Sequence, residues 1–129
     1  MTEKISKNTK IDVSVKVPKT VIIHDNVVIE EGVVLHDYII IYPGTVIKKN
    51  TEIYDHCVIG KLPTTPGSTA KTYDSKYGKT VIGENCILCP GVILYTGTKI
   101  GHNTLLGDNC SIRENCAVGN YCIISRNVS

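Results

Sequence analysis

An aliphatic residue recurs at every sixth position along most of the chain. Steps of six from Ile5 meet ten such residues in ten tries, up to Ile59, and a second run of eight extends from Ile82 to Ile124. Ten and eight make 18 hexads of equal length. Neither a helical period nor two-residue hairpin loops accompany the pattern. The periodicity therefore predicts a fold built by repeating one short unit.

The position two residues before each aliphatic residue is small or β-branched in nearly every hexad. Residues two apart on a strand share a face, so both positions are expected to point inward. The intervening residues are turn-like, as in IHDN, IEEG, IYPG, IGEN and IGHN. Asn and Gly supply the backbone conformations that a corner needs. Each unit is therefore predicted to be a short strand and a corner, stacked in parallel around an aliphatic interior.

These hexads resemble the hexapeptide-repeat superfamily, in which three hexads form one triangular turn of a left-handed parallel β-helix. The resemblance covers the chain apart from its first four residues and the segment 65–81. It implies an all-β fold of about six coils, which parallel pairing would stack about 4.8 Å apart. The left hand comes from the resemblance, because parallel crossovers are ordinarily right-handed. Residues 1–129 are expected to form a single domain.

Composition narrows the functional classes. The chain has 129 residues and a formal net charge of +2, which argues against a broad nucleic-acid-binding surface. Its longest uncharged stretch, Asn85 to Thr98, is too short to span a bilayer. The start, MTEKISKNTK, lacks the apolar region of a secretory signal. With six cysteines and no such signal, we expect a cytoplasmic protein with free thiols.

The cysteines follow the repeat and do not follow a ligand pattern. Five of them, all except Cys89, occupy the small inward position of a hexad. The only zinc-type spacing is Cys86–Cys89, without a second pair. We therefore expect the thiols to pack the interior, and we predict no metal.

One segment, at about residues 61–80, interrupts the register. It is rich in Pro, Gly, Thr, Lys and Tyr, which predicts a protruding loop. The loop is either a tolerated surface insertion or a functional arm, in which Tyr73, Lys76 and Tyr77 would bind substrate. Members of the superfamily commonly extend such a loop to a neighbouring subunit's active site, which favours the functional arm.

Two exterior rows of the predicted coil are aliphatic. Ile22, Ile40, Val58 and Ile93 form one row, and Val34, Ile87, Leu105 and Ile123 form the other. Rows of this kind exceed what a monomer usually exposes, so they predict self-association. The superfamily is typically trimeric, and the resemblance implies a homotrimer.

The best-known activity of the superfamily is acyl transfer from a coenzyme A thioester. The stretches GKLPTTPGSTAKTYDSKYGKTVIGEN and GTKIGHNTLLGDNCSIREN resemble the branch that N-acetylates amino sugars. The resemblance implies acetyl-CoA as co-substrate and a nucleotide-linked amino sugar as acceptor, in surface polysaccharide synthesis.

That chemistry needs an amine freed of its proton and a polarised thioester carbonyl. Our candidate catalytic residues are His102, Asp108 and Glu114, with Ser111 and Arg113 binding substrate. Ordinary corner roles are the alternative, especially for His102. No two acid–base groups are forced together within one chain, so we expect a composite site between subunits.

Three further interpretations concern alternatives and chain length. A γ-type carbonic anhydrase shares the fold, but its H-x-x-x-x-H histidine pair is missing here. A non-catalytic scaffold or assembly protein is a second alternative. The chain stops at Ser129 without a polar cap, and relatives in the amino-sugar branch continue for several coils. We therefore expect a truncated chain or a fragment.

Overall fold

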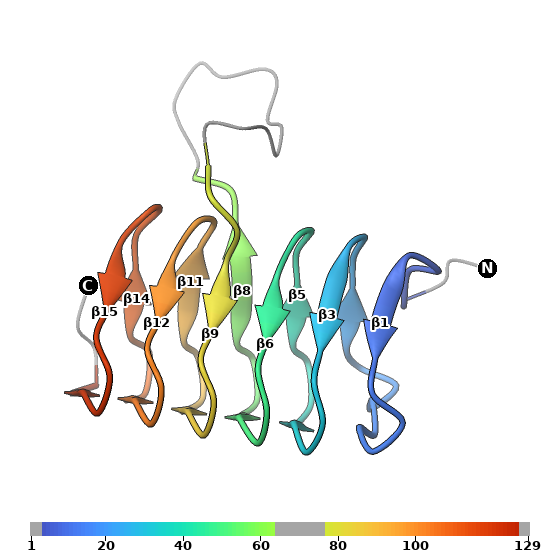
Figure 1. The fold of residues 1–129 in the computed structure, drawn as a ribbon, viewed down its shortest axis with the longest axis horizontal. Coiled ribbons are helices and arrows are strands. Elements are labelled where there is room, and N and C mark those ends of the chain that lie inside the picture. The colour runs from blue at the N-terminus through green and yellow to red at the C-terminus, as the bar shows by residue number, and fades with distance from the viewer. Residues whose placement is uncertain (1–3, 64–76, 127–129) are drawn as a thin grey trace.

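The computed structural model describes residues 4–63 and 77–126. Within them the chain forms sixteen short β-strands and no helix, arranged as three parallel sheets. Figure 1 looks onto one sheet with a second behind it, and the coils follow one another from the N-terminus to the C-terminus. The predicted all-β solenoid of about six coils is confirmed, and its architecture is consistent with a left-handed parallel β-helix.

Sheet I takes one strand from each of the six coils, and sheets II and III take one from each of the last five. Sheet I contains β1 (Thr9–Ile11), β3 (Val27–Ile29), β6 (Val46–Ile47), β9 (Val81–Ile82), β12 (Lys99–Ile100) and β15 (Ala117–Val118). Sheet II contains β4 (Val34–Leu35), β7 (Glu52–Ile53), β10 (Ile87–Leu88), β13 (Leu105–Leu106) and β16 (Ile123–Ile124). Sheet III contains β2 (Ile22–Ile23), β5 (Ile40–Ile41), β8 (Val58–Lys61), β11 (Ile93–Tyr95) and β14 (Ser111–Ile112).

The strand register repeats the hexad pattern. On sheet I, Ile29 pairs with Ile47, and Ile47 pairs with Ile82 although 35 residues separate them. The usual separation is 18 residues, as between Ile82 and Ile100. The extra residues leave after β8 and return before β9, so the interruption lies between sheet III and sheet I (Figure 1).

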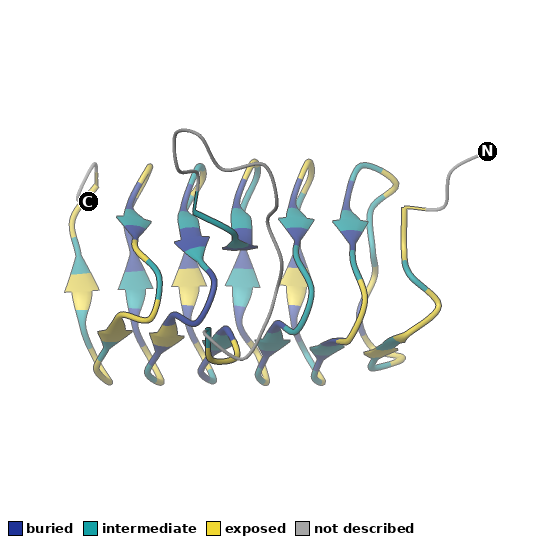
Figure 2. Cartoon of the chain, turned by 90° about the horizontal axis from the view of Figure 1, so that it is seen from above, coloured by how far each residue is buried: buried dark blue, intermediate teal, exposed yellow. Residues whose placement is uncertain are grey.

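The interior is filled as the hexad pattern predicts. Ile41, Ile47 and Ile53, one from each sheet, are completely buried. The small inward positions hold buried threonines whose hydroxyl groups find backbone partners, as when Thr51 donates to the Gly83 carbonyl at 2.7 Å. Figure 2 shows buried segments recurring in the central coils, with more exposed coils at both ends. Every buried hydroxyl that is paired in this way avoids the cost of an unsatisfied polar group.

The corners depend on residues in the left-handed region. At the fourth hexad position nine non-glycine residues have positive φ, and six of them are Asn. Asn tolerates this conformation because its short polar side chain bonds locally. The other three, Tyr38, His56 and Tyr121, are bulkier residues in the same conformation. The predicted corner chemistry is thus confirmed, with three exceptions.

Two expectations are corrected by the structure. The hexad at Val17 forms no strand, because Pro18 follows it and lacks the N–H that a sheet requires. Cys116 and Cys122 occupy the inward register, yet Cys116 is exposed and Cys122 is half-buried. They lie in the last described coil, where no further described coil covers them. Cys57, Cys86 and Cys110 are buried, as predicted.

No membrane-crossing segment is found among residues 4–63 and 77–126, since they include no long apolar helix.

Candidate functional site

The three edges of the prism carry different charges. We call the corner between sheets III and I the loop edge, the corner between sheets I and II the second edge, and the corner between sheets II and III the third edge. The loop edge holds Lys7, Lys61, Lys79 and Arg113 along with Asp25 and Glu114. The third edge is richer in acid, with Asp37, Asp55 and Asp108. The loop edge is therefore the better place to seek a site for anionic substrates.

Two cations and one ring form a column on the loop edge. Tyr95 pairs with Lys61 across β8 and β11. The Lys61 ammonium lies 5.7 Å from the centroid of the Tyr95 ring, and the Cζ atom of Arg113 lies 4.0 Å from it. These distances are in the range of cation–π attraction. The ring therefore lies between two positive groups, one on the preceding coil and one on the following coil.

Glu114 places a carboxylate beside this column. Its Oε1 atom lies 3.2 Å from Nε of Arg113. The same oxygen is shielded from solvent and makes no hydrogen bond with the described residues, while the side chain as a whole is 33% exposed. The shielded oxygen is out of a ligand's reach, so only the exposed part of the side chain could accept a proton from a ligand or bind an ammonium group.

The base of the loop lies against the same edge. The Gly78 N–H donates to Asn115 Oδ1 at 3.3 Å, which ties the returning chain to the coil that bears Glu114. A small cavity of about 140 Å³ lies there, lined in part by Tyr77, Lys79 and Thr96. Tyr77 is therefore placed at the loop edge. Tyr73 and Lys76 lie outside the described residues.

His102 lies on the second edge and is held by hydrogen bonds to the preceding and the following coil. Its Nδ1 accepts the Glu84 N–H at 2.9 Å, and its own N–H donates to Asn120 Oδ1 at 2.7 Å. An imidazole that accepts at Nδ1 carries its proton on Nε2 when neutral. In this arrangement His102 can donate a hydrogen bond outward, but Nε2 has no lone pair with which to take a proton.

Asp108 lies on the third edge and faces a thiol. Burial raises the pKa of Cys89, and the nearby carboxylate of Asp108 raises that pKa further. Both effects keep the thiol protonated, so Cys89 is not an activated nucleophile. Asp108 is itself exposed, and it lies in the loop before β14.

The structure brings together some of the sequence-predicted residues and separates others. Tyr77, Arg113 and Glu114 share the loop edge, and Ser111 lies nearby on sheet III. His102 and Asp108 lie on the other two edges. Lys61 and Tyr95 were missed by the sequence reasoning. The hexad register could have found Tyr95, because it occupies the same position as Arg113 one coil earlier.

Histidine side chains elsewhere stack on tyrosines and do not converge. His24 stacks on Tyr42, His36 on Tyr54, and His56 on Tyr38, with ring centroids 4.3–5.2 Å apart. His36 Nε2 also lies 2.8 Å from Glu52 Oε2. Across the part of the chain that the structure describes, no three His, Cys, Asp or Glu side chains are grouped to hold a metal ion.

Comparisons with known proteins agree with this architecture. Residues 97–129 match the bacterial transferase hexapeptide (six repeats) family. The solved UDP-N-acetylglucosamine acyltransferase of Francisella novicida has a TM-score of 0.70 and 22% identity, over 95% of this chain and 52% of that one. The UDP-N-acetylglucosamine O-acyltransferase of Moraxella catarrhalis RH4 has a TM-score of 0.40 and 16% identity, over 97% of this chain and 66% of that one. No curated protein sequence matches the chain at a significant level.

Residues 97–129, about a quarter of the chain, are thus similar to the hexapeptide-repeat transferases. The likeness to the Francisella enzyme is a likeness of fold, given its 22% identity. The chain spans about half the length of that enzyme. The resemblance to amino-sugar N-acetyltransferases stays a prediction.

Proposed function

We propose that the chain acts in an acyltransferase that moves an acetyl or other short acyl group from acyl-coenzyme A to the amine of a nucleotide-linked amino sugar. The observation that carries the proposal is the loop edge, where Glu114 is paired with Arg113 and the Tyr95 ring contacts both Arg113 and Lys61. A hexapeptide-repeat match and the shared fold of an acyltransferase that acts on a UDP-linked sugar support the same class of reaction.

In this proposal Glu114 deprotonates the acceptor. An amine attacks only after losing its proton, and a carboxylate within hydrogen-bond reach accepts it. The amine nitrogen then bonds to the carbonyl carbon, the carbon–sulfur bond breaks, and the second proton lost by the nitrogen passes to the departing thiolate. Glu114 releases the first proton to water. Arg113 pairs with Glu114 before the acceptor arrives, and it fixes the carboxylate in place.

The cationic column would bind substrate phosphates. Both co-substrates carry phosphate groups, and a guanidinium beside an ammonium group binds such groups well. Tyr95 limits the motion of both cations, so less side-chain entropy is lost when the phosphate binds. The hydrogen-bond donors of this edge therefore suit the phosphate groups of acyl-coenzyme A.

The active site would be shared between subunits of a homotrimer. Val34, Ile87 and Ile123 are 47%, 39% and 80% exposed on sheet II, which supports an interface there. His102 and Asp108 cannot reach Glu114 of their own chain from the other two edges, so they would serve the loop edge of a neighbouring copy. There His102 would donate its Nε2–H to the developing oxyanion.

The test is an assay of thiol release from acetyl-CoA with a panel of nucleotide-linked amino sugars. We expect Glu114→Gln to lower kcat roughly 100-fold, since a positioned base contributes about that much. Glu84→Gln, at the equivalent corner position on the second edge, is the matched control and should retain turnover. Unchanged turnover in Glu114→Gln would remove this carboxylate from the mechanism, and no transfer to any acceptor in the panel would contradict the proposed function.

A further inference from the structure

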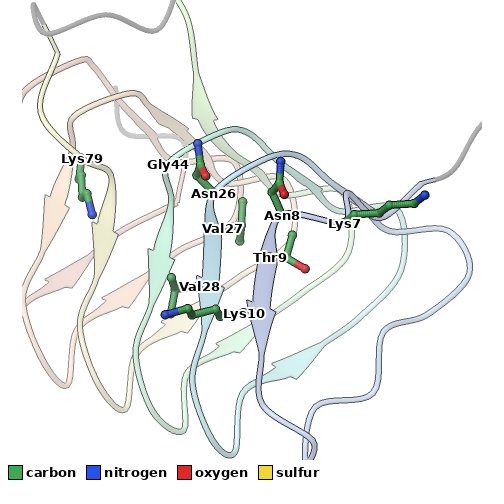
Figure 3. A pocket seen from close by; sticks show the side chains of 9 residues that line it. All are labelled: Lys7, Asn8, Thr9, Lys10, Asn26, Val27, Val28, Gly44 and Lys79. Atoms are coloured by element: carbon green, nitrogen blue, oxygen red, sulfur yellow. The ribbon is translucent and has the colours of Figure 1, made fainter.

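A second cation-bearing site lies on the opposite side of the loop base. A groove of about 610 Å³ crosses the outer face of sheet I near its loop edge (Figure 3). We call it the lysine groove, and its walls include Lys7, Lys10, Lys79, Asn8, Asn26 and Val28. Glu114 and Arg113 lie on the C-terminal side of the loop base, whereas the lysine groove lies on the N-terminal side, over β1 and β3.

The groove is positively charged. Three of its lining residues are lysines, and none of the described residues that line it is acidic. Asp25 lies next to Asn26 on the loop edge, and its carboxylate already accepts the Ser6 hydroxyl. Asp12, Glu30 and Glu31 line the next hollow along sheet I, which shares Lys10 and Val28 with the groove. The groove therefore has a net attraction for anions.

The positive field extends beyond the groove itself. The Lys99 ammonium, on β12, donates to the Lys79 carbonyl. Burial lowers the pKa of Lys99, and the neighbouring charge of Lys79 lowers it further. Two ammonium groups that repel one another are stabilised when an anion comes between or beside them. An anion bound near Lys79 would relieve this repulsion.

The other walls suit a ligand that is more than a bare anion. The amide side chains of Asn8 and Asn26 lie next to one another at the corner (Figure 3), and both can donate and accept hydrogen bonds. Val28, on the outer face of β3, supplies an apolar floor. The volume lies within the range of ordinary small-molecule sites, roughly 300 to 1,000 Å³. Amides, an apolar floor and lysines together match a nucleoside that carries phosphate.

We infer that the lysine groove is a binding site for a nucleoside phosphate, with Lys10 and Lys79 contacting its phosphate groups. Two sources share this chemistry, namely the diphosphate of a nucleotide-linked sugar and the phosphorylated adenosine of coenzyme A. The choice between these two sources rests on the proposed function, but the binding of a nucleoside phosphate does not. A transferase with two phosphorylated co-substrates needs two such sites, and the loop base would separate them.

The experiment is calorimetric titration of the chain with UDP and, separately, with adenosine 3′,5′-bisphosphate. Lys10→Met and Lys79→Met should each weaken binding of the recognised probe by about tenfold, because one charge contact to phosphate is lost in each. Lys10→Arg should retain affinity to within about threefold. Lys16→Met removes an exposed lysine outside the groove and should leave affinity unchanged. Thermal melts of each variant check that the coil is intact.

Binding of UDP would assign the groove to the nucleotide-linked sugar, and binding of the bisphosphate would assign it to coenzyme A. The inference is overturned if neither probe binds, if the groove variants bind as the unaltered chain does, or if Lys16→Met weakens binding equally. The titration does not measure acyl transfer, so its result is separate from that of the activity assay. Binding in the groove without turnover would contradict the proposed function alone. Turnover, together with groove variants whose binding is unchanged, would contradict this inference alone.

Discussion

The Cζ atom of Arg113 lies 4.0 Å from the centroid of the Tyr95 ring, and the two residues are 18 positions apart. They occupy equivalent positions in successive coils, so the solenoid itself brings them into contact. Lys61 pairs with Tyr95 from the preceding coil. The repeat thus brings Arg113 onto Tyr95, whereas Lys61 pairs with Tyr95 after a register shift between Leu94 and Tyr95.

Removing the ring should weaken phosphate binding. Tyr95→Leu leaves both cations free to move, and an exposed cation–π contact contributes about 0.5–1 kcal/mol. We expect a rise of about five-fold in the Kd of the chain for coenzyme A, measured by calorimetry. Tyr42→Leu is the matched control, because Tyr42 occupies the equivalent position two coils earlier and stacks on His24. Equal losses in both variants would show that Tyr95 has no particular role.

The interior and exterior of one strand should respond differently to truncation. Ile47 is completely buried on β6, while the adjacent Val46 points outward and is half-buried. Ile47→Ala should lower the free energy of unfolding by about 2–5 kcal/mol, since it removes buried methyl groups and leaves a cavity. Val46→Ala should cost less than about 1 kcal/mol. Urea denaturation of both variants measures the difference, and comparable losses would contradict the inward and outward assignment.

The sequence was sufficient to predict the register of the coil. Ile47 and Ile82 pair as the hexad phase requires, despite the residues inserted between them, because each hexad contributes one inward residue of fixed spacing. The strand at Val17 was predicted wrongly, since the aliphatic period takes no account of the proline that follows. The predicted burial of Cys116 was also wrong, because an inward residue of a solenoid is buried only when a further coil is stacked on its own coil.

The candidate site was less accessible to sequence reasoning. The hexad phase predicts that Arg113 and Glu114 lie on the loop edge. It does not predict that one Glu114 oxygen is shielded or that Lys61 lies against Tyr95. Those features depend on side-chain conformations at an edge, which periodicity does not specify. The periodicity also does not predict the hydrogen bond that Nδ1 of His102 accepts from the Glu84 N–H, since this bond depends on the orientation of the imidazole ring.

The corner residue Tyr121 offers a stabilising substitution. It has φ of 56° and is 76% exposed. A left-handed conformation costs most residues roughly 1–2 kcal/mol, and Asn is among the few that adopt it readily. Tyr121→Asn should therefore raise the free energy of unfolding by about 1 kcal/mol. The reciprocal change, Asn103→Tyr, at the equivalent position one coil earlier, should lower it by a similar amount. Thermal melts measure both changes. If Asn is not the more stabilising residue at either position, the argument from backbone conformation is contradicted.

Cys57 should make the fold sensitive to alkaline pH. Burial raises the pKa of this thiol from its ordinary 9.0 to about 12. Between these two values an unfolded chain has lost the thiol proton while the folded chain keeps it, so stability must fall as pH rises through this range. The full loss approaches about 4 kcal/mol, from three pH units at 1.36 kcal/mol each.

The measurement is urea denaturation at pH 8 and at intervals up to pH 11, with the difference between the unaltered chain and Cys57→Val isolating the thiol. Val is well suited because Val92 fills the equivalent inward position one coil later and is completely buried. Cys57→Val should lose less stability with rising pH than the unaltered chain. Cys116→Val, which replaces an exposed thiol at an inward register position, should instead follow the unaltered chain. Parallel curves for all three proteins would show that the Cys57 thiol is not held protonated by the interior.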